Sequence, residues 1–144
     1  ETFLDELIAF LRAALPRLRA QSSSLVREAE LAGAFARLNA LAADSEFALS
    51  VDIAPDALHA RFPPGVLLPL LHHAVGGGTR CRLMASRLKD TCLLVLVLGS
   101  APADHCIERV RSLLAELYGE AGNLLIEQHN GAVNVAVKVP YELA

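Results

Sequence analysis

Three short groups of residues in this sequence could take part in chemistry. His72 and His73 are adjacent imidazoles, a residue type that commonly binds metal ions. The run of three glycines at 76–78 could bring backbone N–H groups close to a phosphate. His105 and Cys106 pair a base with a thiol, as nucleophilic enzymes do. Each group has a functional interpretation and a structural one.

The structural interpretation is favoured for all three groups. Neighbouring residues of a helix point about 100° apart, so His72 and His73 are poorly placed to share one ion and suit a surface or pocket-edge position. The glycine run follows the expected end of a helix, where the dipole repels anions, so it predicts a helix stop and a turn. His105 and Cys106 are also adjacent, and no third group is evident to orient them.

The spacing of apolar residues predicts the elements that position these groups. Helices are expected at about 2–19 with a break at Pro16, at 25–42, after Pro63 and Pro64, and from a capping Asp104 to Gly119. Strands are expected at about 46–53, 79–87, 91–98, 124–129 and 132–139. This order predicts an α/β chain, an α+β two-layer sandwich with about five mixed strands. A helical arm (1–43) precedes the α/β domain (44–144).

Finer features of these elements are also predicted. Ser22, Ser23 and Ser24 offer N-cap hydroxyls to the second helix. Tight turns are expected at 89–90 and at Asn130-Gly131, a type I′ signal. The apolar run 93–98 predicts a central strand covered on both faces. The strand at 46–53 should be half-buried, and the fourth helix should bury Ile107, Val110, Leu114 and Leu117.

Composition excludes several classes of protein. The chain has 144 residues, of which 53% are hydrophobic and 20% charged, so it is too apolar to be disordered. Its longest uncharged stretch, 62–79, contains three prolines and makes a poor membrane span, and no signal peptide opens the chain. A net charge of −3 argues against nucleic-acid binding. Cys81, Cys92 and Cys106 lack C-x-x-C spacing and indicate free thiols in a reducing cytoplasm.

Two surface patterns have open interpretations. The stripe Leu4, Leu7, Ile8, Leu11 and Leu15 could pack on its own domain or form a homodimer, and self-association is favoured because the stripe would otherwise stay exposed. A second group of side chains forms a basic strand edge, which is either a solvated edge that resists aggregation or a docking patch for an acidic domain. Its members are Arg80, Arg82, Arg87 and Lys89.

The order of elements and several short motifs resemble the C-terminal region of LytS/AlgZ-type sensor histidine kinases. Phe62-Pro63-Pro64 with Leu67-Leu68-Pro69-Leu70 is similar to the opening of that family's N-box helix. Glu116-Leu117-Tyr118-Gly119 is similar to the family's R-L-x-x-x-Y-G helix end. The resemblance covers nearly the whole chain. It implies a GHKL (Bergerat) ATP-binding fold behind a dimerisation arm, at the cytoplasmic end of a sensor that is often membrane-anchored.

The motifs that bind nucleotide in that family are altered here. In the family's N box, an Asn binds Mg²⁺ and the preceding Glu activates the phosphoacceptor; His73 and His72 stand at these positions. The family's D-x-G-x-G motif has an Asp that accepts a hydrogen bond from adenine, where this chain has Leu98-Gly99-Ser100. The family's ATP lid and second glycine motif are replaced by 100–103, and the glycines 76–78 remain as a degenerate part of the pocket.

The resemblance and the departures together predict a degenerate ATPase-like domain. Its expected work is dimerisation, signal relay or docking of a response-regulator receiver domain, with no catalytic residue, no bound ATP or metal, and no contact with nucleic acid or membrane. An alternative is a working kinase that binds ATP and Mg²⁺ in an unusual way. A third is an unrelated binding module whose ligand lies under His72 and His73. The family's phosphoacceptor motif lies upstream of Glu1, so the chain is expected to be a piece of a longer protein.

Overall fold

The computed structural model describes residues 2–14, 23–42, 48–76, 80–99 and 101–143, with the side chains of 2, 13, 14, 42, 72–76 and 129 left out. The helices are α1 (Thr2–Ala14), α2 (Leu25–Ala42), α3 (Leu67–Gly76), α4 (Asp104–Tyr118) and the 3-10 turn η2 (Gly119–Ala121). The strands are β1 (Ser23–Ser24), β2 (Ala48–Ile53), β3 (Arg61–Phe62), β4 (Arg80–Leu88), β5 (Thr91–Leu98), β6 (Asn123–His129) and β7 (Ala132–Pro140).

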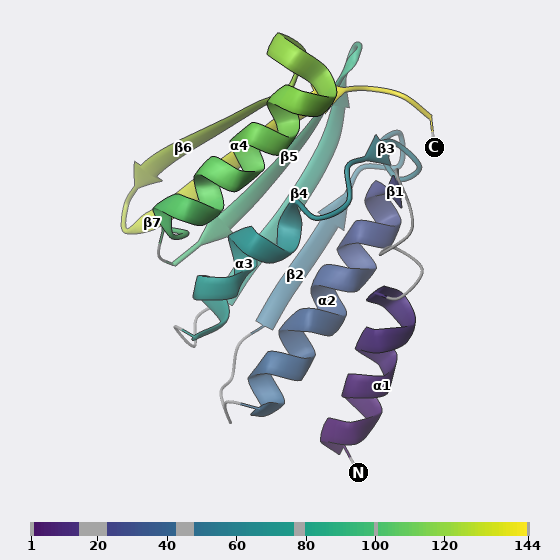
Figure 1. The fold of residues 1–144 in the computed structure, drawn as a ribbon, viewed down its shortest axis with the longest axis vertical. Helices are drawn as coiled ribbons and strands as arrows, with labels where there is room; N and C mark the ends of the chain where they lie inside the picture. Colours follow the sequence, from purple (N-terminus) through teal and green to yellow (C-terminus); the bar gives the residue numbers. More distant parts are fainter. Residues whose placement is uncertain (1, 15–22, 43–47, 77–79, 100, 144) are drawn as a thin grey trace.

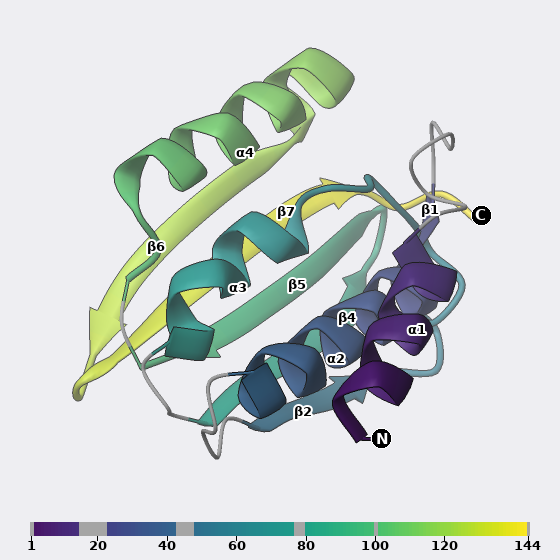
Figure 2. The same cartoon turned by 60° about the horizontal axis from the view of Figure 1, so that its bottom comes forward.

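A five-stranded mixed sheet forms one layer of the molecule. Its strand order is β2-β4-β5-β7-β6, with β2 parallel to β4 and all other neighbours antiparallel. Helices α2, α3 and α4 cover one face of this sheet, and α1 lies on α2 on the side away from the sheet (Figures 1 and 2). The predicted two-layer α/β sandwich with about five mixed strands is confirmed.

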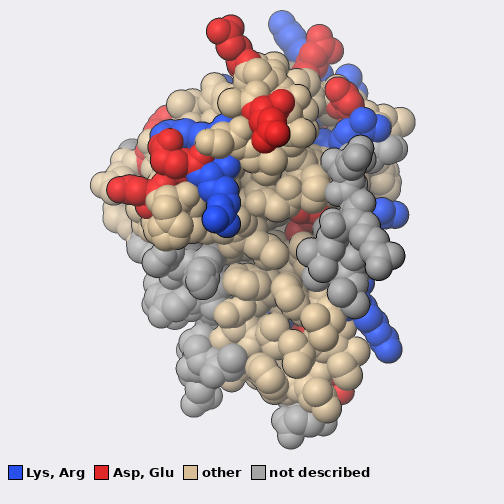
Figure 3. Space-filling model, in the orientation of Figure 1, with Lys and Arg blue, Asp and Glu red and all other residues tan. Residues whose placement is uncertain are grey.

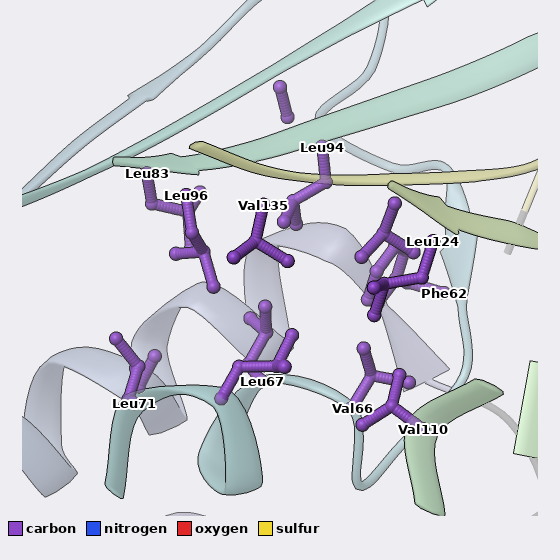
Figure 4. Packing of buried hydrophobic residues seen from close by; sticks show 14 of the residues in the cluster. Phe62, Val66, Leu67, Leu71, Leu83, Leu94, Leu96, Val110, Leu124 and Val135 are labelled. Atoms are coloured by element: carbon purple, nitrogen blue, oxygen red, sulfur yellow. The ribbon is translucent and has the colours of Figure 1, made fainter. Parts of the chain in front are cut away.

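The core lies between the sheet and the helices. Alternate residues of the central strands are buried there, including Leu94 and Leu96 of β5 and Val135 of β7, against Leu67 and Leu71 of α3 and Val110 of α4 (Figure 4). Helix α2 contributes Leu25, Ala32 and Ala36 to the same cluster. At roughly 25 cal/mol for each Å² of apolar surface removed from water, this burial is the main force that holds the helices on the sheet.

A second, smaller sheet was not predicted. Strand β1 pairs antiparallel with β3, matching Ser23 to Phe62 and Ser24 to Arg61. The chain beyond β7 reaches the other side of β3, where Ala60 pairs with Leu143 and the Arg61 N–H donates to the Glu142 carbonyl at 2.6 Å. We call the segment 141–143 the C-terminal strap. These pairings tie the start of α2 to the end of the chain.

Several local predictions are confirmed. Helix α2 covers 25–42 as expected, and the Arg27 N–H donates to the Ser24 hydroxyl at 3.3 Å, which makes Ser24 the predicted cap. Asn130 and Gly131 have φ angles of 50° and 80°, as a type I′ turn requires. Helix α4 ends at Gly119, whose N–H donates to the Ala115 carbonyl. The part of the first helix expected beyond residue 14 lies outside the described residues.

Other local predictions are wrong. Pro63 and Pro64 precede α3 instead of opening it, because the turn through Gly65 (φ 86°) comes between them and Leu67. Ala103 holds the N-cap position of α4 and makes no side-chain cap, so Asp104 is the first helical residue. Leu117 is exposed, whereas the next residue, Tyr118, packs against the core at the end of α4.

The burial predicted for β5 is wrong: this strand is central but is covered on one face only, so Leu93, Val95 and Val97 are half-buried. β2 is half-buried as predicted, since Leu49 and Ile53 pack against the core. Val51 between them is exposed, because it lines an open hollow between α2 and β2. None of the helices in the described parts of the chain is long and apolar enough to cross a membrane.

Candidate functional site

The described residues among those singled out for a nucleotide pocket lie at one end of the sheet. His72, His73 and Gly76 belong to the second half of α3, which ends at Gly76 as predicted. The directions of these side chains, and the placement of Gly77, Gly78 and Ser100, lie outside what the structure describes. At this end of the sheet, the structure therefore describes the backbone of α3, β5 and α4.

The connection between β5 and α4 is short. β5 ends at Leu98 and α4 starts at Asp104, which leaves residues 99–103 between them. Ala103 closes the first turn of α4 by accepting hydrogen bonds from the N–H groups of Cys106 and Ile107 at 3.0 and 3.1 Å. Pro102 is buried, so this loop is held against the body. A connection of this length spans the two elements and has no residues left over for a flap.

The space between α3 and α4 is filled by side chains along the described part of α3. Leu67 and Leu71 of α3 and Val66 before it join Ile107, Val110 and Leu114 of α4 in one core cluster, and Figure 4 shows Val66 beside Val110. A ligand under His72 and His73 would need an open groove between these two helices. The first turn and a half of α3 offers no such groove.

A hollow of about 400 Å³ lies beside this end of the sheet. Gly99 and Ala101 of the short loop form one side of it, and the β6–β7 hairpin forms the other with Gln128 and Asn130. Its described lining is neutral, with amide groups and backbone as the polar parts, so it lacks a cation to bind phosphate and a carboxylate to hold a metal ion. Sequence analysis missed this hollow because its residues meet only through strand pairing.

The cysteines are buried. Cys81 and Cys92 face the core from β4 and β5, and burial raises the pKa of both thiols to about 11; for Cys81, a hydrogen bond with the Gly99 backbone opposes part of this rise. A thiol with so high a pKa is a poor nucleophile at neutral pH. Cys106 points into the core while His105 is exposed, so the two do not form a catalytic pair. These positions agree with structural thiols.

The predicted basic edge does not exist as an edge. β4 lies between β2 and β5, so its backbone is paired on both sides. Arg80 and Arg82 are exposed on the face of the sheet that has no helices. Arg87 lies over the ring of Tyr141 at 3.8 Å, and its Nε donates to the Lys89 carbonyl at 2.8 Å. The four side chains therefore occupy separate surroundings and do not form one patch.

Helix α1 packs on α2 with one side only. The rings of Phe10 and Phe35 are 6.1 Å apart, and Arg37 forms an ion pair with Glu6 at 3.0 Å. A neighbouring side of α1 is apolar and exposed, with exposed fractions of 40–51% for Leu4, Ile8 and Leu11, and Phe3 in the first turn is 41% exposed. Leu7 is half-buried, and Leu15 lies outside the described residues. Most of the predicted stripe is thus free to contact another surface.

A metal centre requires several ligands close together. In the parts of the chain that the structure describes, no three His, Cys, Asp or Glu side chains come together.

Comparison with known proteins finds similarity in structure and none in sequence. No protein-family model matches the chain, and no curated protein matches it. The catalytic domain of histidine kinase ThkA, in a nucleotide-free form, matches with a TM-score of 0.62 and 11% identity over 85% of this chain and 97% of that domain. A solved chain of the Acinetobacter baumannii histidine kinase AdeS matches with a TM-score of 0.62 and 9% identity, covering 95% of this chain and 76% of that chain.

A third match is a complex. ThkA bound to the response regulator protein TrrA matches with a TM-score of 0.58 and 12% identity, covering 96% of this chain and 48% of the ThkA chain. The structural similarity of these matches establishes the fold. Their low sequence identity leaves the chemistry open. The chain has the fold of histidine kinase catalytic domains.

Proposed function

We propose that this chain is a histidine kinase-type ATPase domain that has lost nucleotide binding and acts in signal transduction without ATP turnover. The loop 99–103 carries this proposal, because a domain of this fold needs a flap and a phosphate-binding backbone between β5 and α4, and only five residues connect them. The neutral lining of the adjacent hollow supports the same conclusion. His72 and His73, in place of a carboxylate and an amide, supply no oxygen ligand for Mg²⁺.

The role of a domain without nucleotide binding is proposed to be structural, and the chain is proposed to act as a homodimer in the cytoplasm. The exposed side of α1 is suited to pair with a second copy, because an apolar stripe of this size on a free helix is usually covered. Figure 3 supports this location: charged side chains gather over α4, whereas the surface over α1 and α2 carries few. Docking of a response-regulator receiver domain is proposed by analogy with the ThkA–TrrA complex.

Calorimetric titration with ATP and Mg²⁺ tests the loss of nucleotide binding. We expect no heat beyond dilution up to about 1 mM nucleotide, with an active histidine kinase catalytic domain as the positive control. Thermal unfolding gives a second measurement, since a dissociation constant of about 10 μM would stabilise the fold by about 2.7 kcal/mol at 1 mM ligand. Binding in the low micromolar range would overturn the proposal and favour a working kinase with unusual nucleotide contacts.

A further inference from the structure

The face of the sheet opposite the helices is the largest surface that the proposed function does not use. Residues that alternate with the buried ones point to this face. Strand pairing aligns them in rows, two across all five strands and one across four. In strand order, the rows are Ser50-Arg82-Val97-Asn134-Glu127, Asp52-Met84-Val95-Ala136-Leu125, and Ser86-Leu93-Lys138-Asn123. We call this surface the outer face.

The centre of the outer face is apolar. Four neighbouring residues of the middle row, Met84, Val95, Ala136 and Leu125, form an uninterrupted apolar band. Val97 and Leu93 extend it on β5 in both directions. Leu125 is 45% exposed, and a shallow hollow of about 160 Å³ opens beside Met84 and Val95. A surface of this kind in water is typical of a contact site.

Charges of both signs surround the apolar centre in alternation. Asp52, the pair Arg82 and Arg80, Glu127 and Lys138 follow one another around it as minus, plus, minus, plus. Lys138 and Glu127 are about 14 Å apart along neighbouring strands, too far to pair within one chain. Among the described residues, no ion pair joins any of these charged side chains. Their charges are therefore available to a partner.

This arrangement is complementary to itself. Consider a two-fold axis that lies in the plane of the sheet, passes near Val95 and runs obliquely across the strands. Rotation of a second copy about this axis places the two outer faces against each other and brings Lys138 to the second copy's Glu127. The same rotation brings Arg82 to the second copy's Asp52. The strands of the two sheets then cross at roughly 40°. Because the operation is two-fold, each contact occurs twice.

We propose that the outer face binds the outer face of a second copy of this chain. The contact covers on the order of 400 Å² of each copy, or about 800 Å² in total, which is below the range of stable specific interfaces, so the association is weak and responds to local concentration. It is separate from pairing through α1. Together the two contacts would join α1-paired dimers into larger assemblies, whereas either one alone stops at a dimer.

Charge reversal tests the proposal on the full chain by sedimentation equilibrium at up to about 1 mM protein. Glu127→Lys and Lys138→Glu should each weaken the association about tenfold, because each places like charges in contact twice. The double variant should restore the affinity to within about threefold of the original. An equal mixture of the two single variants should also associate, since every contact between unlike chains is then attractive. Arg109→Glu and Glu116→Lys, exposed on α4, are the matched controls.

The outcomes separate this proposal from the others. Measurements repeated with Leu4→Asp/Leu11→Asp exclude association through α1, and circular dichroism checks that each variant is folded. The proposal is overturned if the Leu4→Asp/Leu11→Asp variant, with an unchanged outer face, stays monomeric at about 1 mM. It is also overturned if the single charge reversals leave the affinity for self-association unchanged, or if the double reversal has no higher affinity than the single ones. None of these results bears on nucleotide binding or on pairing through α1.

Discussion

Cys81 and Cys92 are the residues whose chemistry the fold changes most. Both thiols lie in the centre of the core, where water cannot solvate a thiolate, and their pKa values rise from 9.0 to about 11. Folding therefore favours the neutral thiol. This contribution to stability is fully present below pH 9 and is lost as the pH rises towards 11.

We expect the free energy of unfolding to fall between pH 9 and pH 11. A pKa difference of one is worth about 1.4 kcal/mol, so each thiol contributes at most about 3 kcal/mol to the loss. Urea unfolding at several pH values measures it. The variant Cys81→Ala/Cys92→Ala should show a smaller loss over the same interval, although Tyr118, whose burial also raises its pKa, still contributes. An unchanged pH profile in that variant would contradict the expectation.

At the scale of residues, the sequence predicted what local chemistry decides. Asn130-Gly131, the cap at Ser24 and the helix end at Gly119 follow from the backbone angles and hydrogen bonds that those residues favour. Asp104 and Leu117 were predicted wrongly because the route of the loop before α4 and the packing at the end of that helix depend on distant parts of the chain. The hollow beside Gln128 could not be predicted for the same reason.

The C-terminal strap makes several different contacts for its short length. The Tyr141 N–H donates to the Asp90 carbonyl at 2.7 Å, and the Tyr141 ring stacks under the Arg87 guanidinium. Arg61 contacts Glu142 through its backbone N–H and through an exposed ion pair at 3.4 Å. The strap thus connects the β4–β5 turn with β3.

Truncation after Pro140 should lower the free energy of unfolding by about 2 kcal/mol, from two backbone hydrogen bonds and one cation–π contact. Urea unfolding checks this value. Glu142→Gln should cost less than about 0.5 kcal/mol, because the side-chain pair is exposed. Equal losses in both variants would mean that the ion pair, and not the backbone pairing, holds the strap.

The elements themselves were predicted well where a segment has a clear apolar period. α2 and β5 begin and end where the apolar pattern does. The pairs of residues in β1 and β3 were missed because a strand of two residues has no period, and its existence depends on the partner. The side of β5 that stays open could not be predicted either, since an apolar run does not say how many layers cover it.

At the scale of the whole molecule, α1 is an addition to a complete core. Among the described residues, the core cluster draws on α2, α3, α4 and the strands, and α1 contributes none. Its contacts with α2 through Phe10 and Glu6 place it, and its other side faces solvent. Changes on that side should therefore affect association without affecting the fold.

We expect Leu4→Asp/Leu11→Asp to lower the affinity for self-association through α1 at least about tenfold, because charges then lie in an apolar contact. Sedimentation velocity at micromolar concentration measures this, below the range where the outer face contributes. The melting temperature should stay within about 3 °C. Leu117→Asp, an exposed leucine on α4, is the matched control and should leave the affinity unchanged. Equal effects of both changes would exclude α1 as the interface.

The strand β3 has a consequence for protein engineering. It holds β1 on one side and the C-terminal strap on the other, so Ser23 and Leu143 lie about two strand spacings, or roughly 10 Å, apart. A linker of about five residues could close the body into a ring. New chain ends opened at Asn130-Gly131 would then give a circular permutant with the same sheet. The order of the strands along the chain could thus be changed while their order in the sheet stays the same.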